Sequence, residues 1–184
     1  VYQKDSNTNK FQVWMRGWIG DNGDPDDWLG FFFGHHDSKN ARFSYDNPTV
    51  IALVKQARTL NSQAERAKIY ARVGDLALAD LPMIPIAHGG SGVAYRADVG
   101  NPHVSPLGNE EFFMMTPGDR DTFVWMQNGE PGGLYCADES DGESLRVCEQ
   151  ILESLYGYEV AGTKAIPALA KECTPSADLM TWTC

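Results

Sequence analysis

Residues 15–27 read Met-Arg-Gly-Trp-Ile-Gly-Asp-Asn-Gly-Asp-Pro-Asp-Asp, and this stretch decides the fold that the sequence predicts. Apolar and polar side chains alternate before it, which predicts a strand over residues 11–18 with one buried face. Gly17, Gly20 and Gly23 then predict a turn where backbone approaches another molecule closely. Because Asp21 lies in that turn, we expect a site for a small molecule that carries a positive charge.

Residues 17–21 and 23–26 resemble the signature of the extracytoplasmic solute-binding proteins that serve peptide-importing ABC transporters. The resemblance continues through residues 47–60, 61–81 and 82–88, which are similar to the two helices and the strand that follow this signature in the family. It covers roughly the first hundred residues, and a match of that extent is more specific than an isolated Gly-Trp motif.

From Thr122 onward the chain resembles the beginning of the same family. The similarity lies in an opening strand at 122–125, a helix led by 141–147, the segment 166–170 and a strand at 181–183. The family's tail therefore precedes its head, with a joint near residues 116–120.

We interpret residues 1–118 as the C-terminal part and residues 119–184 as the N-terminal part of lobe I, together one domain. A circularly permuted or excised lobe explains this order, since neighbouring termini can be joined through an exposed loop. A sequence assembled from the ordered parts of a longer chain explains it equally well. In both cases the second lobe is missing.

The resemblance implies an α/β fold, namely one lobe of a two-lobed periplasmic-binding-protein fold with a mixed sheet flanked by helices. The residues themselves predict a helix from Asn47-Pro48, a second helix from near Asn61 to Pro82 and a third after residues 140–142. The third helix should bury Leu145, Cys148, Ile151, Leu152 and Leu155 and expose Arg146, Glu149, Gln150 and Glu153. Strands are predicted near residues 11–18, 83–88, 92–96, 122–127 and 179–184.

The resemblance also implies how a peptide would bind. Asp21 would hold the α-ammonium group through charge-assisted hydrogen bonds. The backbone of Gly17 and Ile19 would pair with the extended ligand, and Trp18 would form a pocket wall. The opposite side of the peptide would contact Ser140, Asp141 and Gly142. The alternatives are an Asx-turn for Asp21, ordinary core packing for Trp18 and capping of the third helix by residues 140–142.

Other chemistry finds less support in the sequence. The neighbouring Asp24, Asp26 and Asp27 raise the alternative of a calcium-stabilised structural or carbohydrate-interacting module, but the order of an EF-hand loop is absent. Residues 35–37, His-His-Asp, are interpreted as a surface loop. Motifs of serine hydrolases, zinc proteases and phosphate-binding loops are missing, so we predict no enzyme, no metal and no cofactor. A hydrolase with paired carboxylates is a weaker alternative.

Composition limits the class of protein. The chain has 184 residues and a formal net charge of -10, which argues against nucleic acid as a partner. The segment 1–4 has no signal-peptide character, and no apolar run reaches the roughly 20 residues that span a bilayer. The expected partners are short peptides, the membrane permease of an ABC transporter and the missing second lobe.

All four cysteines lie in the last third of the chain. Local geometry favours pairing of Cys136 with Cys148 and of Cys173 with Cys184, the second pair across a hairpin turned by residues 174–178. Disulfides indicate an oxidising compartment, so we expect a periplasmic or cell-surface location. The alternative is four buried thiols in a cytosolic protein.

Overall fold

The computed structural model describes residues 10–15, 17–34, 45–139 and 141–184. The chain forms two compact units. The first takes in the chain up to Ala87 together with Ser176–Thr181, and the second takes in His88–Pro175 and Trp182–Cys184. The joint predicted near residues 116–120 lies inside the second unit.

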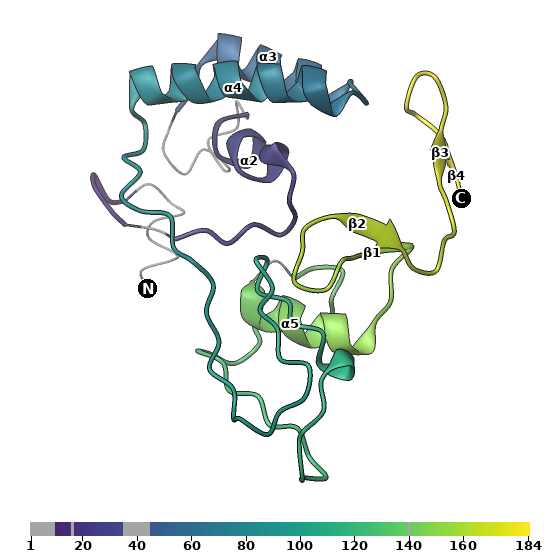
Figure 1. The fold of residues 1–184 in the computed structure, drawn as a ribbon. Helices are drawn as coiled ribbons and strands as arrows, with labels where there is room; N and C mark the ends of the chain where they lie inside the picture. The colour runs from purple at the N-terminus through teal and green to yellow at the C-terminus, as the bar shows by residue number, and fades with distance from the viewer. Residues whose placement is uncertain (1–9, 16, 35–44, 140) are drawn as a thin grey trace. The chain divides into compact units, whose positions relative to one another are not determined.

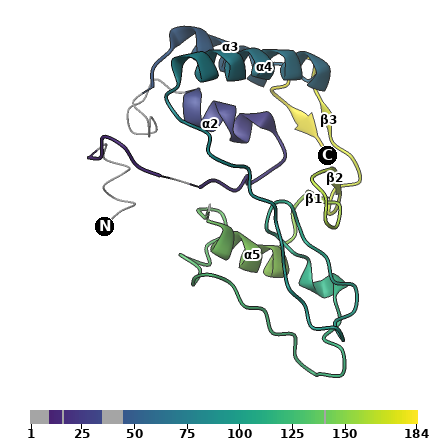
Figure 2. The same ribbon diagram turned by 60° about the vertical axis from the view of Figure 1, so that its left-hand side comes forward.

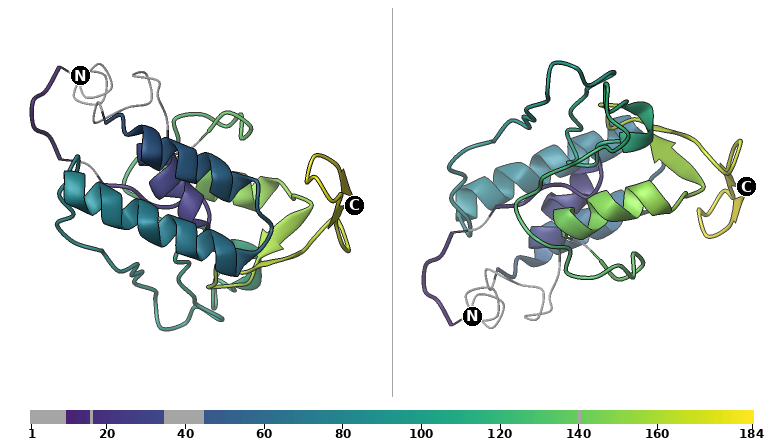
Figure 3. Two further views of the ribbon diagram at one scale, coloured as in Figure 1. Left: turned by 90° about the horizontal axis from the view of Figure 1, so that it is seen from above. Right: turned by 90° about the horizontal axis from the view of Figure 1, so that it is seen from below.

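The first unit is helical. Its elements are the 3-10 helix η1 (Pro25–Asp27) and the α-helices α2 (Leu29–Phe33), α3 (Pro48–Arg58) and α4 (Gln63–Asp80). Helices α3 and α4 lie side by side with α2 packed beneath them, and two views of the ribbon agree on this layering (Figures 1 and 2). Seen from above, α3 and α4 run alongside each other over most of their length (Figure 3).

The two long helices begin where the sequence predicts. The Asn47 side chain caps α3 by accepting hydrogen bonds from the backbone N–H groups of Thr49 and Val50, and Pro48 occupies the first helical position. Ser62 caps α4 by accepting from Glu65. Helix α4 ends at Asp80, because Leu81 adopts the left-handed conformation with φ of 49°. Both helix predictions are thereby confirmed.

One apolar cluster forms the core of the first unit. Helix α3 contributes residues spaced along a single face, α4 contributes a matching face, and α2 closes the cluster with phenylalanines. Its buried members are Phe32, Phe33, Val50, Val54, Ala57, Tyr70, Val73 and Ala77. Burial of side chains of this size, each contributing about 1.5–3 kcal/mol for the larger ones, makes this cluster the main stabilising feature of the unit.

The second unit combines short helices with two antiparallel two-stranded sheets. Its helices are η2 (Phe112–Met114) and α5 (Gly142–Ile151). Strand β1 (Tyr156–Tyr158) pairs with β2 (Ala165–Pro167), and strand β3 (Thr174–Pro175) pairs with β4 (Trp182–Thr183). The first hairpin was not predicted as such. Of the strand predicted at 179–184, only β4 forms.

Disulfides join Cys136 to Cys148 and Cys173 to Cys184, which confirms the predicted pairing. The cysteines are 12 and 11 residues apart in sequence, so each bond closes a short loop. Loops of this length predict roughly 3 kcal/mol of stabilisation per bond from the restricted unfolded chain. The second unit therefore has covalent support that substitutes for a large apolar core.

Four strand predictions are wrong for the described residues, namely those at 11–18, 83–88, 92–96 and 122–127. A strand needs a neighbour for its backbone groups, and residues 83–88, 92–95 and 122–127 make no backbone–backbone hydrogen bond within the described part of the chain. Side-chain exposure alternates at 122–127 without a strand, and Val124 and Met126 are 74% and 92% exposed. Helices with small sheets remain, so the fold is α/β only in a coarse sense.

The faces of α5 also differ from the prediction. Cys148 is buried as expected, but Ile151 is 61% exposed. Arg146, which was expected on the exposed face, donates from Nε to Oε2 of the buried Glu110 at 3.0 Å and stacks over the ring of Trp125. Arg146 turns inward because the rest of the unit supplies a buried carboxylate and an aromatic ring as partners, whereas Glu149 and Glu153 are exposed as predicted.

Candidate functional site

The glycine-rich turn is built by side chains that cap its own backbone. Oδ1 of Asn22 accepts from the backbone N–H of Asp24 at 2.8 Å, and Oδ1 of Asp24 accepts from that of Asp26 at 2.8 Å. The second bond caps η1, with Pro25 at its first position. The Asx-type bonds of this turn are therefore made by Asn22 and Asp24, and Asp21 has no such bond among the described residues.

Two arginines from the long helices hold the acidic turn. Arg66 of α4 forms a bidentate pair with Asp24, at 2.6 and 2.8 Å. Arg58 of α3 pairs with Asp26, with contacts of 2.9 to 3.1 Å, and the Tyr70 hydroxyl donates to the same carboxylate at 2.7 Å. The hydrogen bond from Arg66 lowers the pKa of Asp24, and burial together with Asp26 raises the pKa of Tyr70 to about 12. Both carboxylates are thus neutralised by fixed cations.

Asp27 connects two of the predicted ligand contacts. Its Oδ2 accepts a hydrogen bond from the backbone N–H of Asp21 at 2.9 Å and another from Nε1 of Trp18 at 3.4 Å. No ion pair of Asp27 is present among the described residues. No described cation therefore offsets the negative charge of Asp27, and this charge acts on the neighbouring groups of the turn.

Asp21 is partly buried, and no described residue forms a hydrogen bond or ion pair with its carboxylate. Burial is the main cause that raises its pKa, and the nearby charge of Asp27 raises it further. The ionised form of Asp21 is consequently destabilised in this environment. Such a carboxylate gains free energy from any cation that reaches it.

The other predicted contacts in this unit differ in their surroundings. The ring of Trp18 stacks on Phe31 with centroids 4.4 Å apart and contacts the edge of the core, in line with the alternative of a packing role. Gly17 and Ile19 are exposed, and a Cβ placed on Gly17 would meet no atom within 4 Å. Open space therefore lies beside the Gly17 backbone.

A cavity of about 420 Å³ lies against the turn. Its walls combine carboxylates, both arginines and one aromatic ring, and they consist of Asn22, Asp24, Asp26, Asp27, Phe31, Arg58 and Arg66. With three carboxylates and two guanidinium groups, the lining carries an excess of negative charge. This composition favours a cationic or zwitterionic small molecule over an anion.

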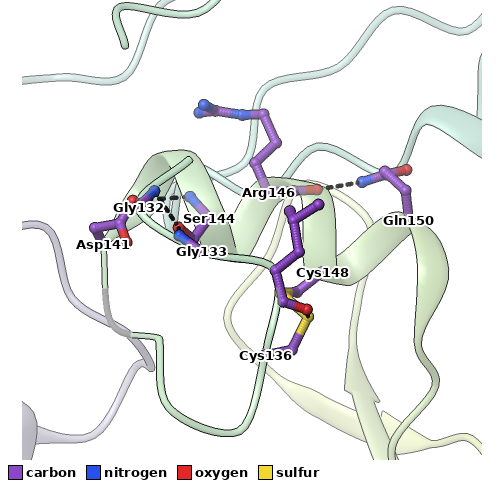
Figure 4. Close-up of a disulfide and its surroundings, with 9 residues drawn as sticks. Gly132, Gly133, Cys136, Asp141, Ser144, Arg146, Cys148 and Gln150 are labelled. Atoms are coloured by element: carbon purple, nitrogen blue, oxygen red, sulfur yellow. Dashed lines mark hydrogen bonds between the residues drawn. A yellow bond between two sulfur atoms is a disulfide. The ribbon is translucent and has the colours of Figure 1, made fainter. Parts of the chain in front are cut away.

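The remaining predicted contacts belong to the second unit, apart from Ser140, which lies outside the described residues. Asp141 caps α5 by accepting from the backbone N–H of Ser144 at 2.8 Å, as the capping alternative expects, and Gly142 is the first residue of the helix. The Ser144 hydroxyl accepts from the backbone N–H groups of Gly132 and Gly133 at 2.9 and 3.3 Å. Figure 4 shows these bonds beside the disulfide that joins Cys148 to the loop.

The calcium alternative finds no support in this geometry. Asp24 and Asp26 already direct their oxygens at Arg66 and Arg58, and a guanidinium beside a carboxylate repels a metal ion. Across the part of the chain that the structure describes, no group of three or more His, Cys, Asp or Glu residues is placed to hold a metal. The His35-His36-Asp37 segment lies outside that part.

Sequence reasoning missed Arg58 and Arg66 as members of the site, and it considered Asp27 only within the calcium alternative. The Arg66–Asp24 pair spans 42 residues of sequence and the Arg58–Asp26 pair spans 32, so no local sequence pattern predicts either ion pair. Only the packing of α3 and α4 against the turn brings these groups together.

Comparisons with curated proteins support the resemblance. The chain is 31% identical over 123 residues to Di/tripeptide-binding protein 1 of Pseudomonas aeruginosa, a match that covers 64% of this chain and 22% of that protein. It is 30% identical over 113 residues to Heme-binding protein A of Haemophilus influenzae, covering 61% and 21%. It is 28% identical over 115 residues to Dipeptide-binding protein of Escherichia coli, covering 60% and 21%.

Over about three fifths of its length the chain is therefore similar to peptide-binding and heme-binding proteins. The resemblance predicted from residues 17–26 is thereby confirmed at the level of the family. The chain spans only about a fifth of the length of the relatives that it matches. No family model and no solved structure matches it. None of the helices within the described residues has the length and apolar character that crossing a bilayer requires.

Proposed function

We propose that this chain forms part of the solute-binding component of a peptide ABC importer and that Asp21 receives the α-ammonium group of a short peptide. The observation that carries the proposal is the partly buried Asp21 carboxylate, which has no cationic partner among the described residues. The relatives that match are named as di- and tripeptide-binding, dipeptide-binding and heme-binding proteins. These names support a binding role rather than a catalytic one.

The charges around the turn favour an ammonium group at this place. Arg66 and Arg58 neutralise Asp24 and Asp26, so neither of these carboxylates competes for the ligand. Burial and the neighbouring Asp27 disfavour the ionised form of Asp21. An ammonium group beside Asp21 restores the ionised form and adds short, charge-assisted hydrogen bonds.

Backbone groups supply the rest of the affinity in this proposal. Gly17 and Ile19 have no backbone–backbone hydrogen bond within the described part of the chain. An extended peptide that pairs with them would be bound through its main chain, which any side-chain sequence provides. The cavity beside Asp27 gives room for the first ligand side chain.

The chain corresponds to one lobe in this proposal, with residues 1–118 and 119–184 in an order opposite to that of the family. In two-lobed receptors a ligand bridges the lobes and shifts the hinge toward the closed state, which the permease then recognises. A lone lobe lacks that second set of contacts. The two disulfides support a location outside the cytoplasm, in the periplasm or at the cell surface.

The experiment is an NMR titration of this chain with Ala-Ala and with N-acetyl-Ala-Ala at millimolar concentrations. The free dipeptide should shift the amide signals of Gly17, Ile19 and Asp21 with weak affinity, and the acetylated peptide should bind at least about tenfold more weakly because it lacks the ammonium group. Asp21→Asn should remove that difference. Asp75→Asn is the matched control, since it makes the same change at an exposed position of α4.

Equal binding of both peptides would remove Asp21 from the ammonium site. Tight binding by the lone chain would show that a second lobe is unnecessary. Because one relative is named as a heme-binding protein, hemin is tested in parallel. Shifts caused by hemin alone would replace the peptide with a different ligand class.

A further inference from the structure

Among the carboxylates of the turn, Asp27 alone combines two properties. Its Oδ2 binds the backbone of Asp21 and the indole of Trp18 at the same time. It also has no ion pair within the described residues, whereas Asp24 and Asp26 each face an arginine. Asp27 can therefore affect a ligand in two ways. Its hydrogen bonds hold Asp21 and Trp18 in place, and its negative charge attracts a cation.

We propose that Asp27 is a positioning residue for the ligand's ammonium group: one oxygen fixes the Asp21 backbone and the Trp18 ring, while its uncompensated charge makes the turn selective for a cation. This inference rests on the proposed function of Asp21. Asp27 need not contact the ammonium group, because its negative charge attracts a cation that lies beside the neighbouring Asp21 carboxylate. The pairing of the other two carboxylates with arginines leaves this selectivity to Asp21 and Asp27.

The close packing around the carboxylate supports a fixed position. Gly20 is buried, and a Cβ added to it would lie 3.0 Å from Oδ2 of Asp27 and 3.0 Å from Nε1 of Trp28. The backbone of the turn therefore passes close to the Asp27 carboxylate, and a Cβ at position 20 would require its neighbours to move by a few tenths of an ångström. Asp27 is also the last residue of η1, whose start is fixed by the Asp24 cap.

The electrostatics agree with the geometry. After burial, the charge of Asp27 is the second cause that raises the pKa of Asp21. Two neighbouring carboxylates that have no ion pair within the described residues create a negative potential that a bound ammonium group relieves. A turn held by hydrogen bonds alone would work equally well with a neutral amide at position 27, and this difference makes the proposal testable.

The test uses this chain with Asp27→Asn and Asp27→Ala. In Asp27→Asn the amide oxygen can still accept both hydrogen bonds, so exchange of the Asp21 amide proton should stay near the wild-type rate. The pKa of the Asp21 carboxyl, followed by carbon NMR, should fall, and Ala-Ala should bind more weakly. In Asp27→Ala the Asp21 amide proton should exchange at least about tenfold faster, because a hydrogen bond to a charged acceptor is lost.

Asp75→Asn and Asp75→Ala are the controls and should change none of these quantities. The proposal is overturned if Asp27→Asn leaves both the Asp21 titration and the Ala-Ala affinity unchanged, since Asp27 is then purely structural. It is also overturned if Asp27→Ala leaves amide exchange unchanged. A wild-type chain that shows no shifts with Ala-Ala counts instead against Asp21 as the ammonium anchor, whereas titration and exchange still decide the role of Asp27.

Discussion

Replacing Arg66 with Met tests whether helix α4 holds the acidic turn. The substitution keeps an unbranched apolar stem and removes the bidentate pair with Asp24, at 2.6 and 2.8 Å, together with the hydrogen bond from Nε to the Ala57 carbonyl. Hydrogen bonds to charged groups contribute about 1.5–3 kcal/mol each, but the Asp24 side chain is 37% exposed, so water screens part of that value. We therefore expect a loss of about 2 kcal/mol, or about 8–16 °C in the melting temperature of a unit of this size.

The assay is hydrogen exchange followed by mass spectrometry in increasing urea, because peptides from α3 and α4 report the first unit separately. Arg72→Met is the matched control, since Arg72 is exposed on the same helix, and it should stay within about 0.5 kcal/mol of wild type. Arg66 lowers the pKa of Asp24, so its stabilising effect is present above the unfolded pKa of about 4 and is lost as the pH falls through the folded value. Equal urea midpoints for both variants at neutral pH would refute the reasoning.

Three further predictions concern single side chains. Arg146→Met should destabilise the second unit by about 3–5 kcal/mol, because Glu110 is only 1% exposed and would keep a buried charge without a partner. Arg96→Met is the control and should have little effect, because the Arg96 side chain is 66% exposed. Urea denaturation of the two variants compares their free energies of unfolding. Asp21→Asn should raise the urea midpoint at neutral pH but not below about pH 4. Because folding raises the pKa of the Asp21 carboxyl, the wild-type protein becomes less stable as the pH rises, and the neutral amide avoids this loss. Leu81→Gly should stabilise α4 by about 0.5–1 kcal/mol in thermal melts, because glycine adopts the left-handed conformation without strain.

The capped helices and the disulfides were predictable because their signals are local. Asn47 with Pro48 fixes the start of α3 within three residues, and the cysteine pairs are separated by 12 and 11 residues. The family signature at residues 17–26 could also be recognised from the sequence, since it lies in one contiguous stretch. In each case neighbouring residues carry the whole cause.

Strands and ion pairs were not predictable in the same way. Strands were predicted at residues 83–88 and 122–127, but a strand exists only where another segment supplies hydrogen bonds. Arg146 was expected to face water, but its side chain is only 17% exposed because it contacts Glu110 and Trp125. These outcomes depend on residues distant in sequence.

The sequence by itself determined where α3, α4 and α5 begin, which cysteines join and which turn carries Asp21, because caps, short loops and glycines act within a few residues of chain. Only the tertiary structure decided that Arg66 and Arg58 pair with Asp24 and Asp26, while Asp21 and Asp27 have no ion pair among the described residues. The physical reason is that an ion pair depends on distance in space, and folding brings together carboxylates and guanidinium groups that lie 32 to 42 residues apart.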